Sequence, residues 1–222
     1  LGPFGYGNSA YSETSDFAGN PLLLSLERLA DQGWIDRKHI DTLPDSASLV
    51  DYDRVFHQKM PLLFEAARGF LRSATGEALR RFESFCAENA WWLDDFVLFD
   101  ALRAKQKLAC WNQWPHGLAH REAAALAAAR EELADDLRVR SALQFGFYEQ
   151  WRDLRRYCAD RNIRIVGDVA IFVNHDSADV WTHRELFRLN SNLDPEVVAG
   201  VPPDFFSKTG QRWGNPLYRW DI

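Results

Sequence analysis

The amino-acid sequence predicts an α/β fold in which barrel strands flank a large block of helices. Residues 163–173 form an apolar, β-branched run that only Arg164 and Asp168 interrupt, as expected of a strand buried on both faces. Between residues 50 and 160, apolar residues recur at helical spacing. Strand, helical block and strand do not form a simple repeat, so they fit a barrel with an insertion after its second strand.

The first segment, residues 1–49, is predicted to contribute a loop and the second barrel strand. Residues 1–21 are rich in Gly, Ser, Asn and Tyr, which indicates a loop. The apolar run at residues 21–26 predicts a strand, and residues 27–33 predict a short helix that ends at Gly33. Pro44 and Asp45 predict a further turn.

The helical insertion is assigned to residues 50–160. Residues 51–74 predict a helix capped by Asp51 or Asp53, with Pro61 kinking it or dividing it in two. Residues 76–89 and 91–106 repeat the helical period.

The second half of the insertion begins with a predicted loop at residues 111–117, which contains two tryptophans and a proline. Residues 121–160 predict a long helical stretch that breaks near Asp135 and Asp136 or near Gly146.

The last segment, residues 161–222, is predicted to hold the third barrel strand and a long loop. Asp168 within the strand is costly to bury unless a polar group meets it, and barrel enzymes commonly present carboxylates at strand ends. Asp176 or Ser177 predicts a helix cap. Residues 200–213 predict a loop stiffened by two prolines, whose polar and aromatic groups suit a sugar: Asp204, Ser207, Gln211 and Trp213.

Composition excludes several classes of partner. The net charge of −6 argues against nucleic acid and against an anionic membrane surface. The three cysteines (Cys86, Cys110 and Cys158) lack paired spacing, so neither a disulfide framework nor a zinc site is indicated, and a reducing cytoplasm fits. Nine tryptophans favour a carbohydrate site mildly, although most are expected to pack in the core.

The sequence indicates no metal and no cofactor. His116 and His120 are four residues apart, but Gly117 and the preceding loop argue against a shared helical face. A glycine-rich phosphate loop is absent from the sequence. His175 and Asp176 are adjacent without a nucleophile motif, so we interpret them as structural.

Three motifs carry a family resemblance. They are Gly-Tyr-Gly-Asn-Ser-Ala-Tyr with Phe-Ala-Gly-Asn-Pro within residues 5–21, Gly-Asp-Val-Ala-Ile-Phe-Val to Asp-Ser-Ala-Asp-Val-Trp within residues 167–181, and residues 198–218. In this order they resemble signatures of the 4-α-glucanotransferases (amylomaltases or disproportionating enzymes) of glycoside hydrolase family 77. Three ordered motifs are far more specific than any one alone.

The resemblance implies a (β/α)8 barrel of the TIM type, of which this chain is expected to be an internal piece, incomplete at both ends. It implies transfer of α-1,4-glucan segments to the 4-hydroxyl of glucose or of another glucan, through a covalent glucosyl-enzyme intermediate. The nucleophilic Asp and the acid/base Glu of the family are expected downstream, so the isolated chain is expected to be inactive. Maltodextrins and glucose are the implied substrates.

Six residues are predicted to bind substrate: Tyr11, Asp168, Asp204, Ser207, Gln211 and Trp213. Four of them have a structural alternative. Tyr11 could be incidental to a surface loop, and Asp168 could pair with an arginine such as Arg164. Asp204 could serve a turn after the two prolines, and Trp213 could anchor the loop.

Two other functions remain open at this stage. An α-amylase-like hydrolase on the same barrel would give only shorter products from maltotriose. A non-catalytic glucan-binding protein would lack the two carboxylates on later strands.

Overall fold

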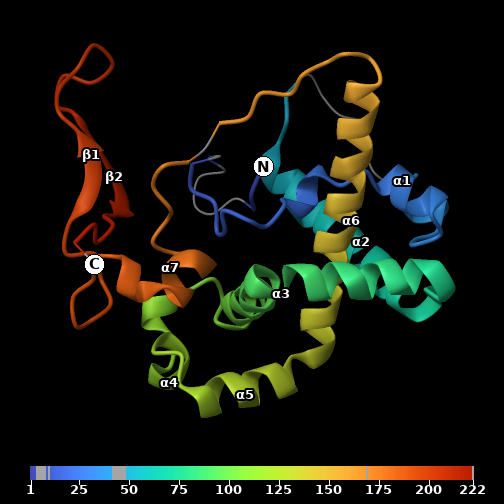
Figure 1. Ribbon diagram of the computed structural model, residues 1–222, viewed down its shortest axis with the longest axis horizontal. Coiled ribbons are helices and arrows are strands. Elements are labelled where there is room, and N and C mark those ends of the chain that lie inside the picture. Colours follow the sequence, from blue (N-terminus) through green and yellow to red (C-terminus); the bar gives the residue numbers. More distant parts are fainter. Residues whose placement is uncertain (4–8, 10, 42–48, 169, 222) are drawn as a thin grey trace. The chain divides into compact units, whose positions relative to one another are not determined.

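The computed structural model describes residues 1–3, 9, 11–41, 49–168 and 170–221 and is mostly helical (Figure 1). The predicted turn at Pro44 and Asp45 lies outside the described residues. The chain divides into two compact units. Unit 1 comprises Leu1, Ala18–Val97 and Leu133–Gly167, and unit 2 comprises Gly2–Phe17, Leu98–Glu132 and Asp168–Ile222.

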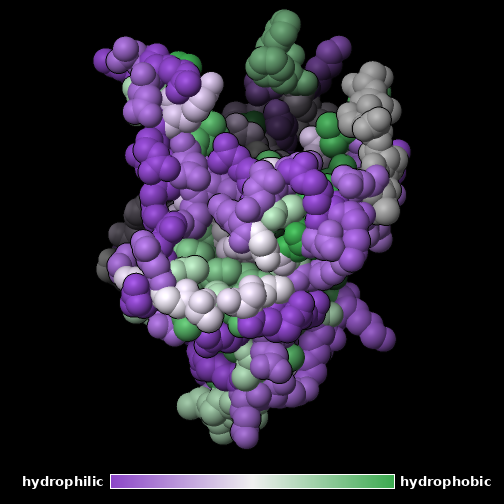
Figure 2. All heavy atoms as spheres, turned by 90° about the vertical axis from the view of Figure 1, so that its right-hand side faces the viewer, coloured by the Kyte–Doolittle hydropathy of each residue, from purple (hydrophilic) through white to green (hydrophobic). Residues whose placement is uncertain are grey.

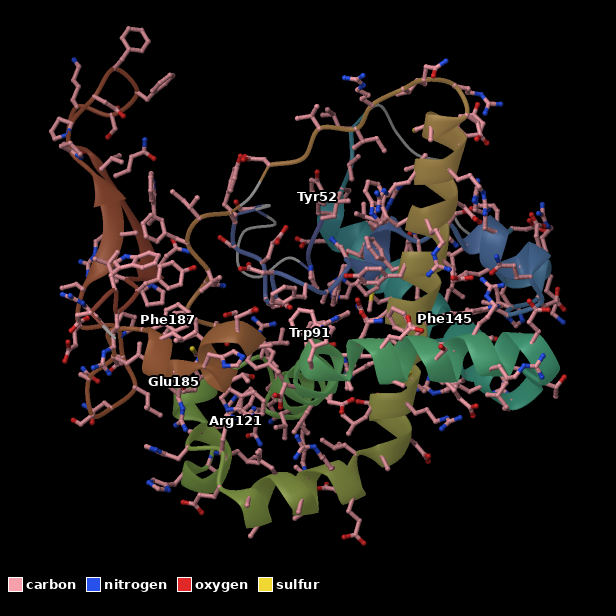
Figure 3. The ribbon with its side chains drawn as sticks, in the orientation of Figure 1. Tyr52, Trp91, Arg121, Phe145, Glu185 and Phe187 are labelled. Atoms are coloured by element: carbon pink, nitrogen blue, oxygen red, sulfur yellow. The ribbon has the colours of Figure 1, made fainter. Side chains whose placement is uncertain are left out.

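Unit 1 is built from helices. Its elements are η2 (Pro21–Leu23), α1 (Leu26–Asp31), η3 (Arg37–His39), α2 (Tyr52–Ser73), α3 (Gly76–Lys105) as far as Val97, and α6 (Ala134–Ala159). Helix α2 packs on α6. Phe145 on α6, labelled in Figure 3, packs against Phe70, Phe82 and Phe85, each at 5.7 Å between ring centroids. This aromatic cluster is the centre of the core of unit 1.

Local sequence signals place the ends of the unit 1 helices as predicted. The Asp51 side chain caps α2 by accepting a hydrogen bond from the Arg54 amide at 3.0 Å. Gly33 follows α1 with φ of 77°, a conformation that glycine adopts without strain. Pro61 lies inside a continuous α2 and does not divide it.

Other helix boundaries differ from the predictions. The two periodic stretches at 76–89 and 91–106 form the single helix α3. The long stretch does break near Asp135 and Asp136, at Leu133, and not at Gly146, to give α5 (Ala123–Glu132) and α6.

Unit 2 contains the remainder of α3 and short elements. They are η4 (Trp111–Gln113), α4 (His116–Ala119), α5, α7 (Ala178–Thr182), η5 (Arg184–Leu186), β1 (Val198–Val201) and β2 (Gln211–Pro216). Phe99, Trp114 and Trp181 form its aromatic centre, with ring centroids 5.5–5.9 Å apart. Residues 111–117, which were predicted to form a loop, contain η4 and the start of α4. Ser177 caps α7 through the Val180 amide at 3.2 Å, as one of the two predicted caps.

Strands β1 and β2 pair antiparallel as a hairpin. Gly200 faces Arg212 and Val201 faces Gln211, and the register is irregular between Val198 and Gly200. The loop between the two strands holds Pro202 and Pro203.

Two predicted strands are wrong. Residues 21–26 form η2 and the start of α1, because the Asn20 and Ser25 side chains cap helical turns through the amides of Leu22 and Arg28. Residues 163–173 hold no strand at their described positions, and Ile163, Ile165 and Val166 are exposed. A strand buried on both faces needs neighbouring strands, and within the described part of the chain the only sheet is that of β1 and β2.

The division into segments 1–49, 50–160 and 161–222 stays a prediction.

The face drawn in Figure 2 carries mostly hydrophilic residues, with hydrophobic ones set among them. Over the described ranges, none of the helices has the length and apolar character needed to cross a membrane.

Candidate functional site

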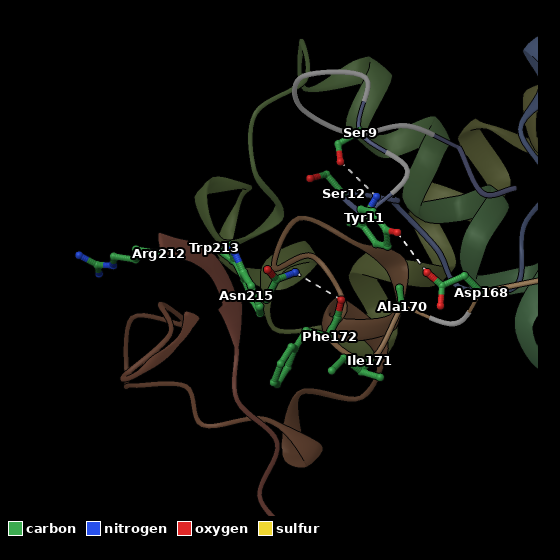
Figure 4. Close-up of a pocket in the computed structure, with 10 residues that line it drawn as sticks. All are labelled: Ser9, Tyr11, Ser12, Asp168, Ala170, Ile171, Phe172, Arg212, Trp213 and Asn215. Atoms are coloured by element: carbon green, nitrogen blue, oxygen red, sulfur yellow. Dashed lines mark hydrogen bonds between the residues drawn. The ribbon is translucent and has the colours of Figure 1, made fainter. Parts of the chain in front are cut away.

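A cavity of about 740 Å³ lies within unit 2 (Figure 4). Its lining comes from the N-terminal loop, from the segment after Asp168 and from β2: Ser9, Tyr11, Ser12, Asp168, Ala170, Ile171, Phe172, Arg212, Trp213 and Asn215. Hydroxyl, carboxylate and amide groups thus share one space with aromatic and aliphatic side chains. Cavities of this size and mixed lining are typical of small-ligand sites.

The polar side of the cavity is a tyrosine–aspartate pair. A local turn presents Tyr11, since the Tyr11 amide donates to Ser9 Oγ at 3.2 Å. The Tyr11 hydroxyl donates to Asp168 Oδ2 at 3.1 Å. This bond and the charge of the Asp168 carboxylate raise the pKa of Tyr11. The phenol is therefore a donor held in place, and the carboxylate beside it is a charged acceptor.

The loop that carries Tyr11 is fixed to α7. The Ala178 amide donates to the Thr14 carbonyl at 2.8 Å, and the Asp16 amide donates to Asp179 Oδ2 at 3.2 Å. Partial burial and the nearby carboxylates of Asp179 and Glu13 raise the pKa of Asp16 to about 7. Burial also raises the pKa of Asp179. The carboxylates of Asp16 and Asp179 therefore lie near each other where the Tyr11 loop contacts α7.

The aromatic side of the cavity is formed by β2 and residues 170–173. The rings of Phe172 and Trp213 lie 6.4 Å apart between centroids. Trp213 Nε1 donates to Gln211 Oε1 at 3.2 Å, and about half of the Trp213 surface is exposed. Asn215 Nδ2 donates to the carbonyl of Val173 at 2.9 Å, which links β2 to the other wall. An exposed indole face can pack against the apolar face of a sugar ring.

Asp204 and Ser207 lie outside this cavity, in the loop between β1 and β2. Asp204 Oδ1 accepts hydrogen bonds from the amides of Phe206 and Ser207 at 2.9 and 2.8 Å. Ser207 Oγ donates to the Gly210 carbonyl at 2.6 Å. This geometry matches the turn-forming alternative for Asp204. Phe205 and Phe206 project from the same turn and are almost fully exposed.

The structure therefore brings together three of the six predicted residues, Tyr11, Asp168 and Trp213, with Gln211 beside Trp213. Sequence reasoning missed Ser12, Phe172 and Asn215 as lining residues. Phe172 was assigned to the interior of a strand. Asn215 lies within the third motif, but no spacing or charge pattern marked it.

His175 and Asp176 do not form a catalytic pair with each other. Arg103 Nε donates to Asp176 Oδ2 at 2.8 Å. His175 Nε2 lies 2.8 Å from the Leu193 carbonyl, and its Nδ1 lies 3.6 Å from Cys110 Sγ. Burial lowers the pKa of His175 and raises that of Cys110 to about 12, so the thiol stays protonated. The contacts of His175 and Asp176 link distant parts of the chain at Arg103, Cys110 and Leu193, and the protonated thiol is not a nucleophile.

The described residues contain no group of three or more His, Cys, Asp or Glu side chains placed to hold a metal ion. His116 and His120 do meet, with ring centroids 4.2 Å apart, but as stacked rings. His116 Nδ1 lies 3.0 Å from Glu122 Oε1.

An open cavity that combines a hydroxyl–carboxylate pair with an exposed indole offers the kinds of group that bind carbohydrate. Comparisons with known proteins identify the family. A family model described as 4-alpha-glucanotransferase matches residues 1–222. The chain belongs to this family, glycoside hydrolase family 77.

Relatives with this activity in their names come from bacteria and plants. The 4-alpha-glucanotransferase of Thermus thermophilus is 46% identical over all of this chain and 44% of its own length. That of Aquifex aeolicus is 40% identical over 97% of this chain and 42% of its own length. A chloroplastic/amyloplastic 4-alpha-glucanotransferase of Solanum tuberosum is 38% identical over 96% of this chain and 37% of its own length.

Among solved structures, the chain is similar to an amylomaltase from Streptococcus agalactiae in complex with acarbose. The TM-score is 0.93 at 35% identity, over all of this chain and 45% of that one. The chain thus spans less than half the length of the relatives that it matches.

Proposed function

We propose that the chain is part of a 4-α-glucanotransferase and that its cavity binds α-1,4-glucan. One observation carries the assignment of the site. The Tyr11–Asp168 pair and the exposed indole of Trp213 line the same cavity, although Tyr11 comes from the N-terminal loop and the other two from the last segment. Each contributes one of the two interactions that a glucose unit needs.

The polar groups and the indole recognise different parts of the sugar. The Asp168 carboxylate accepts hydrogen bonds from glucose hydroxyls, and a charged acceptor makes these bonds stronger than neutral ones. Tyr11 adds a hydroxyl beside it. The Trp213 indole packs against the carbon–hydrogen face of a ring and thereby orients the glucan. Gln211, Asp204 and Ser207 hold or extend the same hairpin and are proposed to contact the acceptor sugar.

The reaction that we propose for the whole protein is retaining glucan transfer. An Asp carboxylate attacks C1 of a glucose unit, the 1,4-bond breaks, and a Glu protonates the departing 4-oxygen. The Glu then takes the proton from the 4-hydroxyl of glucose or of another glucan, which attacks C1 and frees the Asp. Both catalytic acids, held about 5–5.5 Å apart, are proposed to lie in segments outside this chain.

Transfer instead of hydrolysis requires that water is kept from the intermediate. The loop between β1 and β2, with its exposed Phe205 and Phe206, is proposed to cover the acceptor side. We propose maltodextrins and glucose as partners, neither nucleic acid nor a membrane, no cofactor, and a cytoplasmic location. The net charge of −6 supports the first two exclusions.

Product analysis of maltotriose tests this proposal. The whole protein, expressed from the gene that encodes this chain, should release glucose together with maltodextrins longer than maltotriose. Shorter products alone would identify a hydrolase instead. Binding without turnover would identify a non-catalytic glucan-binding protein. The 222-residue chain alone should show no turnover, and turnover by it would contradict the placement of both acids outside it.

A further inference from the structure

Asn215 connects the two walls of the cavity. It lies near the end of β2 (Gln211–Pro216), next to Gly214, whose φ is 86°. Its Nδ2 donates to the Val173 carbonyl at 2.9 Å. The same nitrogen lies 3.4 Å from the Phe172 carbonyl, the contact drawn in Figure 4. The bonds therefore join residues that are more than forty positions apart in the sequence.

The wall that Asn215 reaches has no regular hydrogen-bonding pattern of its own. Residues 170–173 lie in no helix or strand, so their carbonyl groups depend on donors from elsewhere. Val173 is buried, whereas Phe172 lines the cavity beside Trp213, with the two ring centroids 6.4 Å apart. A donor to both carbonyls fixes the path of the chain at the point where it passes from the cavity into the core.

We propose that Asn215 is a positioning residue, whose amide holds Phe172 beside Trp213 so that the two rings form one aromatic surface for a glucan ring. The proposal rests on the proposed function, since it concerns the same cavity. Asn215 acts through Phe172 and the backbone, and its two amide protons are directed to protein carbonyls. Its role is distinct from that of Asp168, whose carboxylate accepts a hydrogen bond from Tyr11 in the cavity lining.

A direct contact between Asn215 and the sugar is the competing role, because Asn215 Oδ1 could accept a bond from a hydroxyl group. Asn215→Asp separates the two. Aspartate has the same shape and keeps an acceptor, but it loses both donors and faces two carbonyl oxygens with a negative charge. A direct acceptor role predicts that binding is kept or strengthened, whereas positioning predicts that it is lost.

The experiment measures maltoheptaose binding by the 222-residue chain through its tryptophan fluorescence, for the unsubstituted protein, Asn215→Asp and Asn215→Ala. Asn112→Ala is the matched control, because Asn112 Nδ2 also links distant segments of unit 2, by donating to Asp194 Oδ1 at 2.7 Å, but lies outside the cavity lining. Circular dichroism confirms that each variant is folded. We expect affinity to fall about tenfold for Asn215→Asp and about threefold to tenfold for Asn215→Ala, and to change less than about twofold for Asn112→Ala.

A second measurement needs no ligand. The indole N–H signal of Trp213 in the nuclear magnetic resonance spectrum, assigned with Trp213→Phe, should shift in both Asn215 variants and stay in place in Asn112→Ala. Binding retained in Asn215→Asp, or equal losses in Asn215→Ala and Asn112→Ala, would overturn the positioning role. If the unsubstituted chain does not bind maltoheptaose, the proposed glucan site fails, while the indole signal still decides whether Asn215 holds the wall.

Discussion

The hydroxyl of Tyr11 donates a hydrogen bond to the carboxylate of Asp168 at 3.1 Å, across 157 residues of sequence. The pair joins the N-terminal loop to the segment that precedes the Phe172 wall. Both residues line the cavity, and Tyr11 is largely exposed. The bond therefore contributes more to the arrangement of the cavity than to the stability of a core.

Removing either partner should weaken glucan binding. Tyr11→Phe deletes the donor and should lower maltoheptaose affinity about threefold to tenfold. Asp168→Asn removes the charged acceptor and should lower it further, because hydrogen bonds to charged groups are the stronger ones. Because the two residues are in contact, the double variant should lose less than the product of the two single effects. Fluorescence titration of the unsubstituted chain and the three variants gives the four dissociation constants.

Tyr157→Phe is the control for this series. Tyr157 lies on α6 in unit 1, is also exposed, and keeps its ring under the Arg161 guanidinium at 3.6 Å. Equal losses of affinity in Tyr157→Phe and Tyr11→Phe would show that the Tyr11 hydroxyl has no specific role in the cavity.

Titration of the Tyr11 phenol should report the same pair without any ligand. The Asp168 carboxylate accepts the phenolic proton and repels the phenolate, so it raises the pKa of Tyr11. The interaction is fully present below the ordinary tyrosine pKa of about 10 and is lost as pH rises through the raised value. The ultraviolet difference between the unsubstituted chain and Tyr11→Phe isolates this phenol. In an Asp168→Asn background its pKa should fall, and an unchanged pKa would refute the contact.

Local signals in the sequence were enough to predict many helix ends. Asp51 and Ser177 cap α2 and α7 because a short polar side chain can satisfy the free amides of its own first turn. Gly33 follows α1 because it adopts positive φ at little cost. These interactions span only a few residues, so the sequence around each end contains all of the partners.

Strands and site geometry depend on partners that lie far away in the sequence. The apolar run at 163–173 has the composition of a buried strand, but within the described part of the chain no strand pairs with it. Tyr11 and Asp168 could be found because they lie in motifs. The bonds of Asn215 to the 172–173 carbonyls could not, because no periodic pattern connects an amide on a hairpin to a loop more than forty residues earlier.

Gly69→Ala should destabilise unit 1 although alanine favours helices. A Cβ at Gly69 in α2 would lie 2.0 Å from the Trp34 carbonyl oxygen, a backbone atom that cannot rotate away. The gain in helix propensity is about 1 kcal/mol, whereas forced overpacking costs about 1–3 kcal/mol or more. We expect a net loss of about 1–2 kcal/mol in the free energy of unfolding, measured with urea. Ser73→Ala, in the exposed last turn of α2, is the control, and a stabilised Gly69→Ala would contradict the close approach.

The carboxyl group of Asp16 makes the seating of the Tyr11 loop sensitive to pH. Asp16 as a residue is exposed at the surface, but its carboxyl group is partly desolvated by the protein around it. This desolvation and the nearby negative charges of Asp179 and Glu13 raise its pKa to about 7. An unfolded chain releases this proton near pH 4. Between these two values the folded chain therefore holds a proton that the unfolded chain has lost.

Proton binding by the folded state means that the contribution of Asp16 to stability falls as pH rises from about 4 to about 7 and is constant above that. Asp16→Asn cannot ionise, so it should remove this part of the decline and stabilise the chain at pH 8. Because solvent screens an exposed carboxylate, we expect a gain of about 1 kcal/mol, less than the full shift would give. Urea unfolding at pH 5 and pH 8 measures it, with Asp41→Asn, an exposed aspartate of unit 1, as the control. A gain at pH 8 no larger than that at pH 5 would mean that the folded chain does not retain this proton, and that the Asp16 and Asp179 carboxylates do not repel each other across the loop and α7.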